Sequence, residues 1–351
     1  MKNITLRNMD GKPHIDKIFI VLTPFHLKSF SEKYGNEIKK RNVLILKETY
    51  LEEKYWTDYE ANIVNMPKNN FRIYDFFETP LMSIIRYRKR ISEIKIFCID
   101  LIEKIDFNQK VTINIGSDRD IFTQIFLNIL YKNLPLNTLK LCAFDEGLGF
   151  YDNQVFFDKI KSFLFPIISP ILFGERIYFN KPMGKDRRID EVFCRFPKFI
   201  AKNGFSKYTI LNVRENTQKG IYNPNSSRVL VFSFPLKDRN IPLSDKVKWL
   251  SSIYRRLEVE EFEVKLHPRE DKFQLPDIPT IFFEGHFPID ELNYFDYKYI
   301  VNFNSSIVMD LLASGYPPDK IITISFGAKL NVSTLYNQTQ YLSINEVLNE
   351  D

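Results

Sequence analysis

The sequence predicts an α/β protein with two domains, each built on a parallel β-sheet. Short apolar runs rich in β-branched residues alternate with amphipathic stretches of helix length, and this pattern stops and restarts once along the chain. The length of 351 residues also exceeds what one hydrophobic core usually holds. Two Rossmann-like domains of this kind are expected to face a cleft, with ligands bound beyond the carboxyl ends of the strands.

Each half of the sequence contributes its own set of predicted elements. In the first half we expect buried strands at 17–23, 41–47, 110–116 and 139–144, with helices at 80–107 and 118–132. In the second half we expect strands at 227–234, 261–267, 280–284, 297–303 and 320–325, with helices at 243–257 and 305–314. Residues 200–226 between them are polar and rich in turn formers. We therefore predict an N-terminal domain over 1–215 and a C-terminal domain over 216–351.

Composition restricts the classes of partner and compartment. A net charge of +5 is too mild for the concentrated basic face of a nucleic-acid binder, so no nucleic-acid partner is expected. The three cysteines, Cys98, Cys142 and Cys194, form no zinc pattern. Together with the polar N-terminal stretch they predict a cytoplasmic protein.

Two segments raise the question of membrane contact. Residues 162–173 are apolar, but the run is too short to span a bilayer and is broken by two prolines, so we interpret it as a buried or interface segment. The basic run 86–90 is interpreted as a solvated helix face. Its functional alternative is peripheral contact with an anionic glycolipid or with the inner face of the membrane.

A first group of candidate site residues follows the strand predicted at 139–144. Two adjacent acids, Asp145 and Glu146, precede Gly147 and Gly149 in a sharp loop. Mutual repulsion and partial burial can raise the pKa of one such carboxyl toward the range of a general base. The structural alternative is an ordinary turn in which the glycines supply positive φ angles.

Two further groups follow strands of the second half. Lys265, His267, Pro268 and Arg269 close the strand predicted at 261–267, where a histidine at the rim can bind a phosphate or donate a proton. The pair Ser305 and Ser306 precedes a predicted helix, where serines cap the helix and its N-terminus can bind phosphate.

An apparent metal motif is interpreted differently. Asp118 and Asp120 form a DxD pattern, but they follow a predicted strand and open a predicted helix, so helix capping accounts for them. We therefore expect no metal site and no cofactor.

The order of the three groups resembles that of the bacterial sialyltransferases, which carry an acid-acid-glycine motif, a His-Pro motif and a serine motif on a two-domain GT-B fold. Phe144 to Gly149 and His267 to Arg269 are most similar to the lipooligosaccharide sialyltransferases of glycosyltransferase family 52. The resemblance implies an inverting, metal-independent transfer of sialic acid from CMP-sialic acid to a galactose-terminated lipooligosaccharide or capsule glycan. It also implies an acceptor-side N-terminal domain and a C-terminal domain that binds the CMP donor.

The resemblance further implies roles for individual residues. His267, with Lys265 or Arg269 nearby, would offset charge on the departing phosphate, and Ser305 and Ser306 would bind that phosphate. Glu291 would bind the ribose hydroxyls. Two assignments of the general base stay open: Asp238, as family 52 suggests, or Asp145 or Glu146, as the other bacterial sialyltransferase families suggest.

Other functions also stay open. A polysialic-acid polymerase and a CDP-glycerol-type phosphotransferase of wall-polymer synthesis would share the fold and some of the motifs. A non-catalytic sugar- or nucleotide-binding protein belongs to another class. A homodimer is one option for the oligomeric state, which the sequence does not determine.

Overall fold

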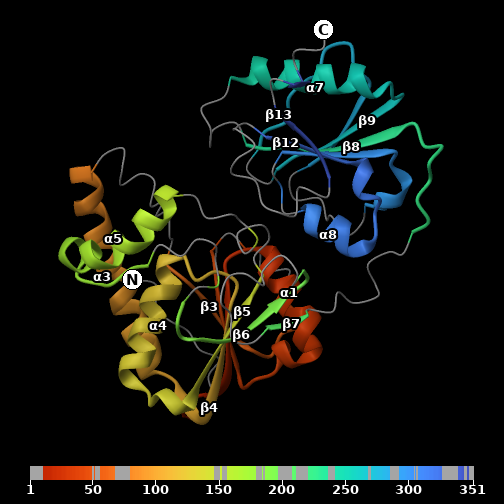
Figure 1. The fold of residues 1–351 in the computed structure, drawn as a ribbon. Helices are drawn as coiled ribbons and strands as arrows, with labels where there is room; N and C mark the ends of the chain where they lie inside the picture. The colour runs from red at the N-terminus through yellow and green to blue at the C-terminus, as the bar shows by residue number, and fades with distance from the viewer. Residues whose placement is uncertain are drawn as a thin grey trace. The chain divides into compact units, whose positions relative to one another are not determined.

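The computed structural model of the chain divides between Asn212 and Val213 into two units, Met1–Asn212 and Val213–Asp351 (Figure 1). The sequence analysis set this boundary between residues 215 and 216. The structure describes residues 11–49, 51, 56–67, 80–145, 151, 156–178, 184, 186–196, 208–210, 220–235, 242–267, 270–284, 292–303, 305, 307–325, 339–343 and 346–347.

The first unit is built on a parallel sheet. Its strands are β1 (His14–Val21), β2 (Val43–Lys47), β3 (Asn62–Asn65), β4 (Asp106–Ile115), β5 (Leu139–Phe144), β6 (Ile189–Cys194) and β7 (Tyr208–Ile210). They lie in the order β3-β2-β1-β4-β5-β6-β7, so the order reverses between β1 and β4. This is the strand order of a doubly wound sheet, which binds ligands at the reversal.

Helices cover both faces of this sheet, with α1 on one side and α4 on the other (Figure 1). The helices are α1 (Pro24–Tyr34), α3 (Pro80–Glu103), α4 (Ile121–Asn133) and α5 (Phe156–Phe173), with short 3-10 turns η1 (Gly35–Lys39) and η3 (Leu136–Thr138). Phe30 of α1 packs against Phe19 and Phe144 of the sheet, at ring-centroid distances of 5.2 and 4.8 Å. A sheet covered in this way needs apolar residues on both faces of its strands, which explains their nearly continuous apolar runs.

A close contact at the strand reversal positions the start of α1. The Thr23 side chain accepts a hydrogen bond from the backbone N–H of His26, and Pro24 occupies the first turn. Nδ1 of His26 accepts a hydrogen bond from the N–H of Leu22 at 3.1 Å. A Cβ atom added to Gly116, which follows β4, would lie 2.4 Å from Cε1 and Nε2 of His26. Glycine is therefore needed for the imidazole to lie against this loop.

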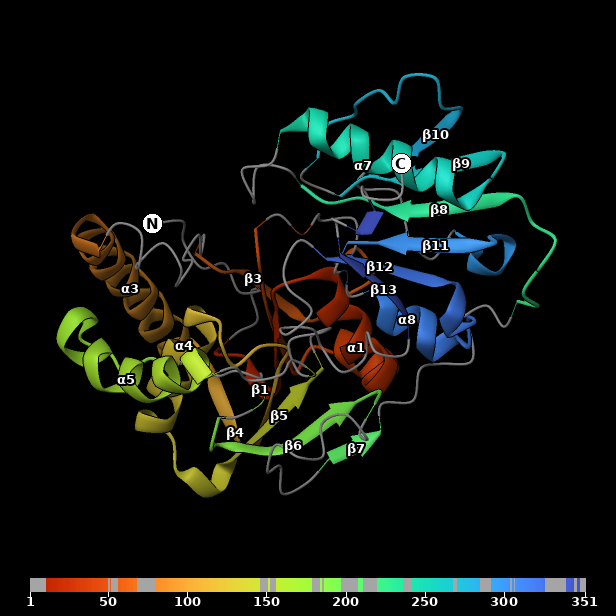
Figure 2. The ribbon, with the colours of Figure 1, turned by 45° about the horizontal axis from the view of Figure 1, so that its top comes forward.

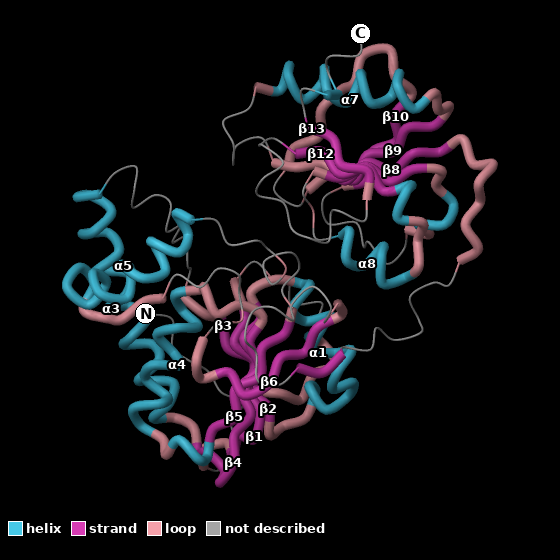
Figure 3. The backbone as a smooth tube through the Cα atoms, viewed as in Figure 1, coloured by secondary structure: helices cyan, strands magenta, loops and turns pink. Residues whose placement is uncertain are grey.

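The second unit repeats the architecture. Its strands are β8 (Arg228–Phe232), β9 (Glu261–Lys265), β10 (Thr280–Phe283), β11 (Tyr299–Asn302), β12 (Ile321–Ser325) and β13 (Gln340–Ser343). Its helices are α7 (Leu243–Leu257) and α8 (Ile307–Ser314), with 3-10 turns η8 (Tyr294–Asp296) and η9 (Pro318–Lys320). The parallel strands lie in the order β10-β9-β8-β11-β12-β13, which reverses between β8 and β11. Figure 3 shows α7 and α8 on opposite sides of this sheet.

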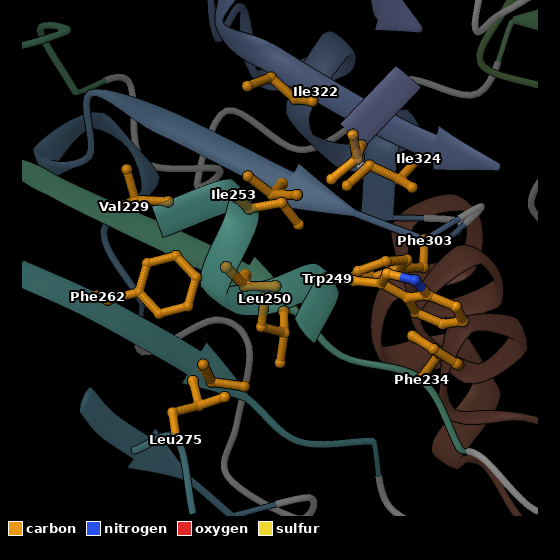
Figure 4. Close-up of a cluster of buried hydrophobic side chains, with 14 of the residues drawn as sticks. Val229, Phe234, Trp249, Leu250, Ile253, Phe262, Leu275, Phe303, Ile322 and Ile324 are labelled. Atoms are coloured by element: carbon orange, nitrogen blue, oxygen red, sulfur yellow. The ribbon is translucent and has the colours of Figure 1, made fainter. Parts of the chain in front are cut away.

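The core of the second unit lies between α7 and the sheet. Trp249, Leu250 and Ile253 of α7 belong to one buried cluster with Val229 of β8 and Phe262 of β9 (Figure 4). Apolar residues at spacings of one, three and four on α7 match the period of a helix with one buried face. The helix ends at Leu257, and the C-cap residue Glu258 takes a left-handed conformation with a φ angle of 46°.

Most predicted elements are confirmed, including the helix at 243–257 and the two parallel-sheet domains. The helix predicted from 118 begins at Ile121, because Asp120 accepts from the backbone N–H of Thr123 and caps it. The prediction that prolines break the run 162–173 is wrong. Helix α5 continues through Pro166 and Pro170, and its Ser169 is fully buried.

We predict that Gly116→Ala lowers the free energy of unfolding of the first unit by about 1–3 kcal/mol, because the added methyl group meets the His26 ring. The chain has two tryptophans, Trp56 in the first unit and Trp249 in the second. Fluorescence during urea unfolding in a Trp249→Phe background therefore reports on the first unit. In an added His26→Ala background the penalty should largely disappear, and an equal penalty in both backgrounds would contradict the steric explanation.

Candidate functional site

The described part of the chain contains four of the predicted site residues: Asp145, Lys265, His267 and Ser305. The other predicted residues lie outside the described residues: Glu146, Gly147, Gly149, Asp238, Pro268, Arg269, Glu291 and Ser306.

Three neighbouring strands carry the candidate residues of the second unit. β8, β9 and β11 lie side by side in the order β9-β8-β11, so the segments that follow them meet at one edge of the sheet. Ser233 follows β8, His267 follows β9 and Ser305 follows β11. The reversal of strand order between β8 and β11 makes this edge the expected ligand-binding edge of the unit.

Glu270 joins the segments that follow β8 and β9. Its carboxylate accepts hydrogen bonds from Ser233 Oγ at 3.2 Å and from the backbone N–H of His267 at 3.1 Å. Its own N–H donates to the carbonyl of His267 at 2.9 Å. Glu270 also forms an ion pair with the buried Lys246 of α7, whose Nζ donates to the carbonyl of Phe234 at 3.0 Å. One carboxylate thus fixes the backbone of His267 to two other segments.

Neither Glu270 nor Lys246 was predicted from the sequence as a site residue. A signal for Glu270 was available in its position three residues after His267, because a glutamate at that spacing can accept from the earlier backbone N–H. Lys246 gave no comparable signal, because a lysine near the start of an amphipathic helix is ordinarily solvated.

Lys265 connects the ends of β9 and β10. Its Nζ donates to the carbonyl of Leu266 at 3.0 Å and to that of Glu284 at 2.8 Å. The side chain is buried, and the removal of its ammonium group from water lowers its pKa to about 8. Lys265 therefore stabilises the backbone that immediately precedes His267.

Ser305 is held at the beginning of α8. The backbone N–H of Ser305 donates to Oδ1 of the buried Asn302 at 3.2 Å, and Asn302 Nδ2 donates to the carbonyl of Ile322 at 3.2 Å. The Ser305 hydroxyl accepts from the N–H of Ile307, the first residue of α8, at 3.3 Å. Ser305 thus binds the first N–H group of α8, whereas the N-cap position itself is Ser306, outside the described residues. The N-terminus of α8 lies beside the segment after β8, because β11 pairs with β8.

Asp145, in the first unit, belongs to a buried network. Its carboxylate accepts from Tyr151 Oη at 2.6 Å and from the backbone N–H of Arg195 at 2.8 Å, and it forms an ion pair with the Arg195 guanidinium. Arg195 also donates to Ser29 Oγ at 3.1 Å and pairs with Glu32 at 2.8 Å, both on α1. Burial and the nearby charge of Asp145 raise the pKa of Tyr151 well above its usual value, so its hydroxyl remains a donor.

The two aspartates of the DxD pattern have separate structural partners. Asp118 is buried and accepts from the backbone N–H groups of Gly184 at 2.9 Å and Asp186 at 3.0 Å. Burial raises its pKa to about 6, although these two hydrogen bonds act in the opposite direction. Asp120 caps α4, as the sequence predicted.

Glu48 was not identified from the sequence. It follows β2, and its N–H donates to the carbonyl of Val21 at 3.1 Å, which places it beside the end of β1. Burial, and secondarily the negative charge of Asp120, raise its pKa to about 7. A carboxyl group with such a pKa at the ligand-binding edge of a doubly wound sheet is suited to proton transfer near neutral pH.

The described residues contain neither a metal-ligand cluster nor a membrane-spanning helix. No group of three or more His, Cys, Asp or Glu side chains in that part of the chain gathers as metal ligands do. No helix there is long and apolar enough to cross a membrane.

Comparisons with known sequences and with solved structures differ in outcome. No family model matches the sequence, and no curated protein is significantly similar to it. The fold, in contrast, matches solved structures along almost the whole chain. CalG4, the calicheamicin glycosyltransferase, is 9% identical with a TM-score of 0.55, over 97% of this chain and 89% of its own.

Two further structures agree with this match. The glycotransferase of kitacinnamycin is 10% identical with a TM-score of 0.55, over 95% of this chain and 87% of its own. MnaA of S. aureus, solved with UDP, is 10% identical with a TM-score of 0.51, over 95% of this chain and 86% of its own. At these identities the similarity establishes the fold, and it confirms the predicted GT-B type with two parallel-sheet α/β domains.

We predict that Glu48→Gln raises the melting temperature of the first unit at about pH 8 and changes it little at about pH 4.5. The folded state binds this proton more tightly than the unfolded chain, where the pKa is 4.5. The stability from this carboxyl is therefore complete below pH 4.5 and is lost as the pH rises through about 7. Trp56 fluorescence in the Trp249→Phe background measures the effect.

The exposed Glu103→Gln on α3 is the matched control and should show no such pH-dependent gain. An equal shift at both pH values for Glu48→Gln would mean that the carboxyl is not titrating in this range.

Proposed function

We propose that this protein is an inverting glycosyltransferase that transfers sialic acid from CMP-sialic acid to a glycan, and that the acceptor is a galactose-terminated lipooligosaccharide or capsule glycan. The GT-B fold supports the general class. The order of the acid-acid-glycine, His-Pro and serine motifs supports the choice of donor and acceptor.

The observation that carries the proposal is the edge formed by the segments after β8, β9 and β11. There the backbone of His267 is fixed by Glu270, and Ser305 lies at the N-terminus of α8. The N–H groups at a helix N-terminus bind phosphate, and a histidine at the same edge of the sheet can neutralise it or donate a proton to it. This edge is suited to the single phosphate of a CMP-activated sugar.

The proposed reaction needs one proton acceptor and one anion-binding site. A carboxylate removes the proton of the acceptor hydroxyl, and the hydroxyl oxygen forms a bond to the anomeric carbon. The bond from that carbon to the CMP phosphate breaks, and its electron pair leaves with the phosphate. His267 offsets the charge there, Ser305 and Ser306 bind the phosphate, and Glu291 binds the ribose. A leaving group with one phosphate can be stabilised by these residues without a metal ion.

The contacts of two residues refine their proposed roles. Asp145 is already engaged by Tyr151 and Arg195, so we assign it a positioning role and leave Glu146 and Asp238 as candidate general bases. Nζ of Lys265 donates to two backbone carbonyls, which favours Arg269 as the cation beside the phosphate.

The proposal also assigns a substrate to each unit and a cellular compartment to the protein. We assign donor binding to the second unit, because His267, Ser305 and Glu291 all belong to it, and acceptor binding to the first. Cys98, Cys142 and Cys194 are free and buried, which suits a reducing cytoplasm.

A second candidate is an enzyme that uses a UDP-activated sugar. It is favoured by the similarity of the fold to MnaA of S. aureus, which was solved with UDP. The donors of the two candidates differ in their nucleobase and in their number of phosphates, so measurements of nucleotide binding distinguish the two candidates.

We predict that calorimetry gives tighter binding of CMP than of UDP or GDP. Glu270→Ala should weaken CMP binding about tenfold or more, because the His267 segment loses a hydrogen bond to a charged group. The exposed Glu260→Ala, before β9 at the opposite end of the strand, should leave binding unchanged. Tighter binding of UDP or GDP would contradict the sialyltransferase proposal.

We also predict that His267→Ala lowers kcat for CMP release from CMP-sialic acid by about two to four orders of magnitude, with little change in melting temperature. Asp238→Asn and Glu146→Gln then identify the base, because only the loss of the base should match the effect of His267→Ala. Asp145→Asn should instead lower the melting temperature, since the buried Arg195 loses one of its two charge partners and keeps only Glu32. Near-normal kcat in folded His267→Ala would refute the role of this histidine.

A further inference from the structure

Helix α5 presents an apolar face to solvent. Six large apolar side chains on it are exposed, and the exposed fractions reach 70% for Phe163 and 74% for Ile171. Their spacings of one, three and four residues place them on one side of the helix. We call this face the α5 surface, and its members are Ile160, Phe163, Leu164, Ile167, Ile168 and Ile171.

The opposite face of α5 is packed and fixes the orientation of the helix. Phe165, Ser169 and Phe173 are buried, and Ser169 Oγ accepts from the N–H of Ile177 at 2.8 Å. The Phe173 ring lies 6.3 Å from that of Tyr87 on α3. The α5 surface is therefore the side that remains after the helix has buried its own core face.

Basic residues of α3 border the α5 surface. Figures 1 and 2 both show α3 and α5 next to each other at the periphery of the first unit. Arg88 donates to the carbonyl of Ile171 at 3.0 Å, so it lies at the end of the apolar stripe. Lys89, next to Arg88, is exposed on the same helix, and Arg176 is exposed beyond the end of α5.

Two acidic residues of this region form ion pairs with neighbouring basic side chains. Glu93 pairs with Arg90 at 2.7 Å, and the buried Glu175 pairs with Lys95 at 2.7 Å. These acids are thereby neutralised locally, and the exposed arginines and lysine give the border of the α5 surface a net positive charge.

We propose that the α5 surface and its basic border dock on an anionic phospholipid bilayer, with α5 lying in the plane of the interface. A helix with one apolar face and adjacent arginine and lysine side chains binds such membranes through apolar burial and attraction to acidic lipids. This inference uses none of the residues assigned to the transfer reaction and stands independently of that proposal.

The test is co-sedimentation of the full chain with vesicles of phosphatidylcholine alone and of phosphatidylcholine mixed with phosphatidylglycerol. The protein should bind the mixed vesicles, and binding should weaken as salt concentration rises. Phe163→Ser/Ile171→Ser should weaken binding about tenfold or more, because two side chains no longer enter the apolar layer. Lys89→Glu/Arg176→Glu should weaken it to a similar extent, and only for the mixed vesicles.

Matched controls use exposed residues elsewhere. Leu136→Ser replaces an apolar side chain that is 69% exposed in the same unit, and Lys248→Glu/Arg255→Glu reverses two charges on α7. Neither control should change vesicle binding, and every variant should keep the wild-type melting curve.

Three results would overturn the inference. One is a wild-type protein that sediments with neither vesicle. Another is binding that neither the apolar variant nor the charge variant weakens. The third is a dimer in solution that Phe163→Ser/Ile171→Ser converts to a monomer, without vesicle binding, since the α5 surface would then bind a second copy of the chain.

Discussion

The carboxylate of Glu270 holds together the segments from which the candidate site of the second unit is built. A buried ion pair is stable only where the remaining oxygen lone pairs also accept hydrogen bonds. Here Lys246 supplies the charge, while Ser233 Oγ and the N–H of His267 supply the hydrogen bonds. These donors come from α7 and from the segments after β8 and β9. The contacts that stabilise the Glu270 charge therefore also fix the position of the His267 backbone.

The first unit uses the same principle at the corresponding edge of its own sheet. Asp145 and Arg195 follow the adjacent strands β5 and β6, and Arg195 reaches Glu32 of α1. Each sheet also has a buried asparagine on the strand that follows the reversal of order, Asn114 in β4 and Asn302 in β11. Polar side chains buried where the parallel strands end thus form hydrogen bonds with backbone groups. The residues beyond the strand ends remain for ligand binding.

The fold could largely be predicted, because strands buried on both faces and amphipathic helices leave clear periodicities, as for the helix at 243–257. Short edge strands such as β3 and β13 were missed, since their polar residues resemble loops. The positions of His267 and Ser305 followed from the ends of predicted strands. Contacts between distant segments did not, because pairs such as Arg195 with Asp145, 50 residues apart, are set by the order of strands in the sheet.

The central proposal is that the His267 imidazole contacts the phosphate of the CMP donor. The chain has only four histidines, so the imidazole proton signals in an NMR spectrum can be assigned with a His267→Ala spectrum. Titration with CMP should shift the His267 signals and raise the pKa of this imidazole, because a bound phosphate favours its protonated form. Unchanged His267 signals at CMP concentrations that calorimetry shows to be saturating would contradict the account.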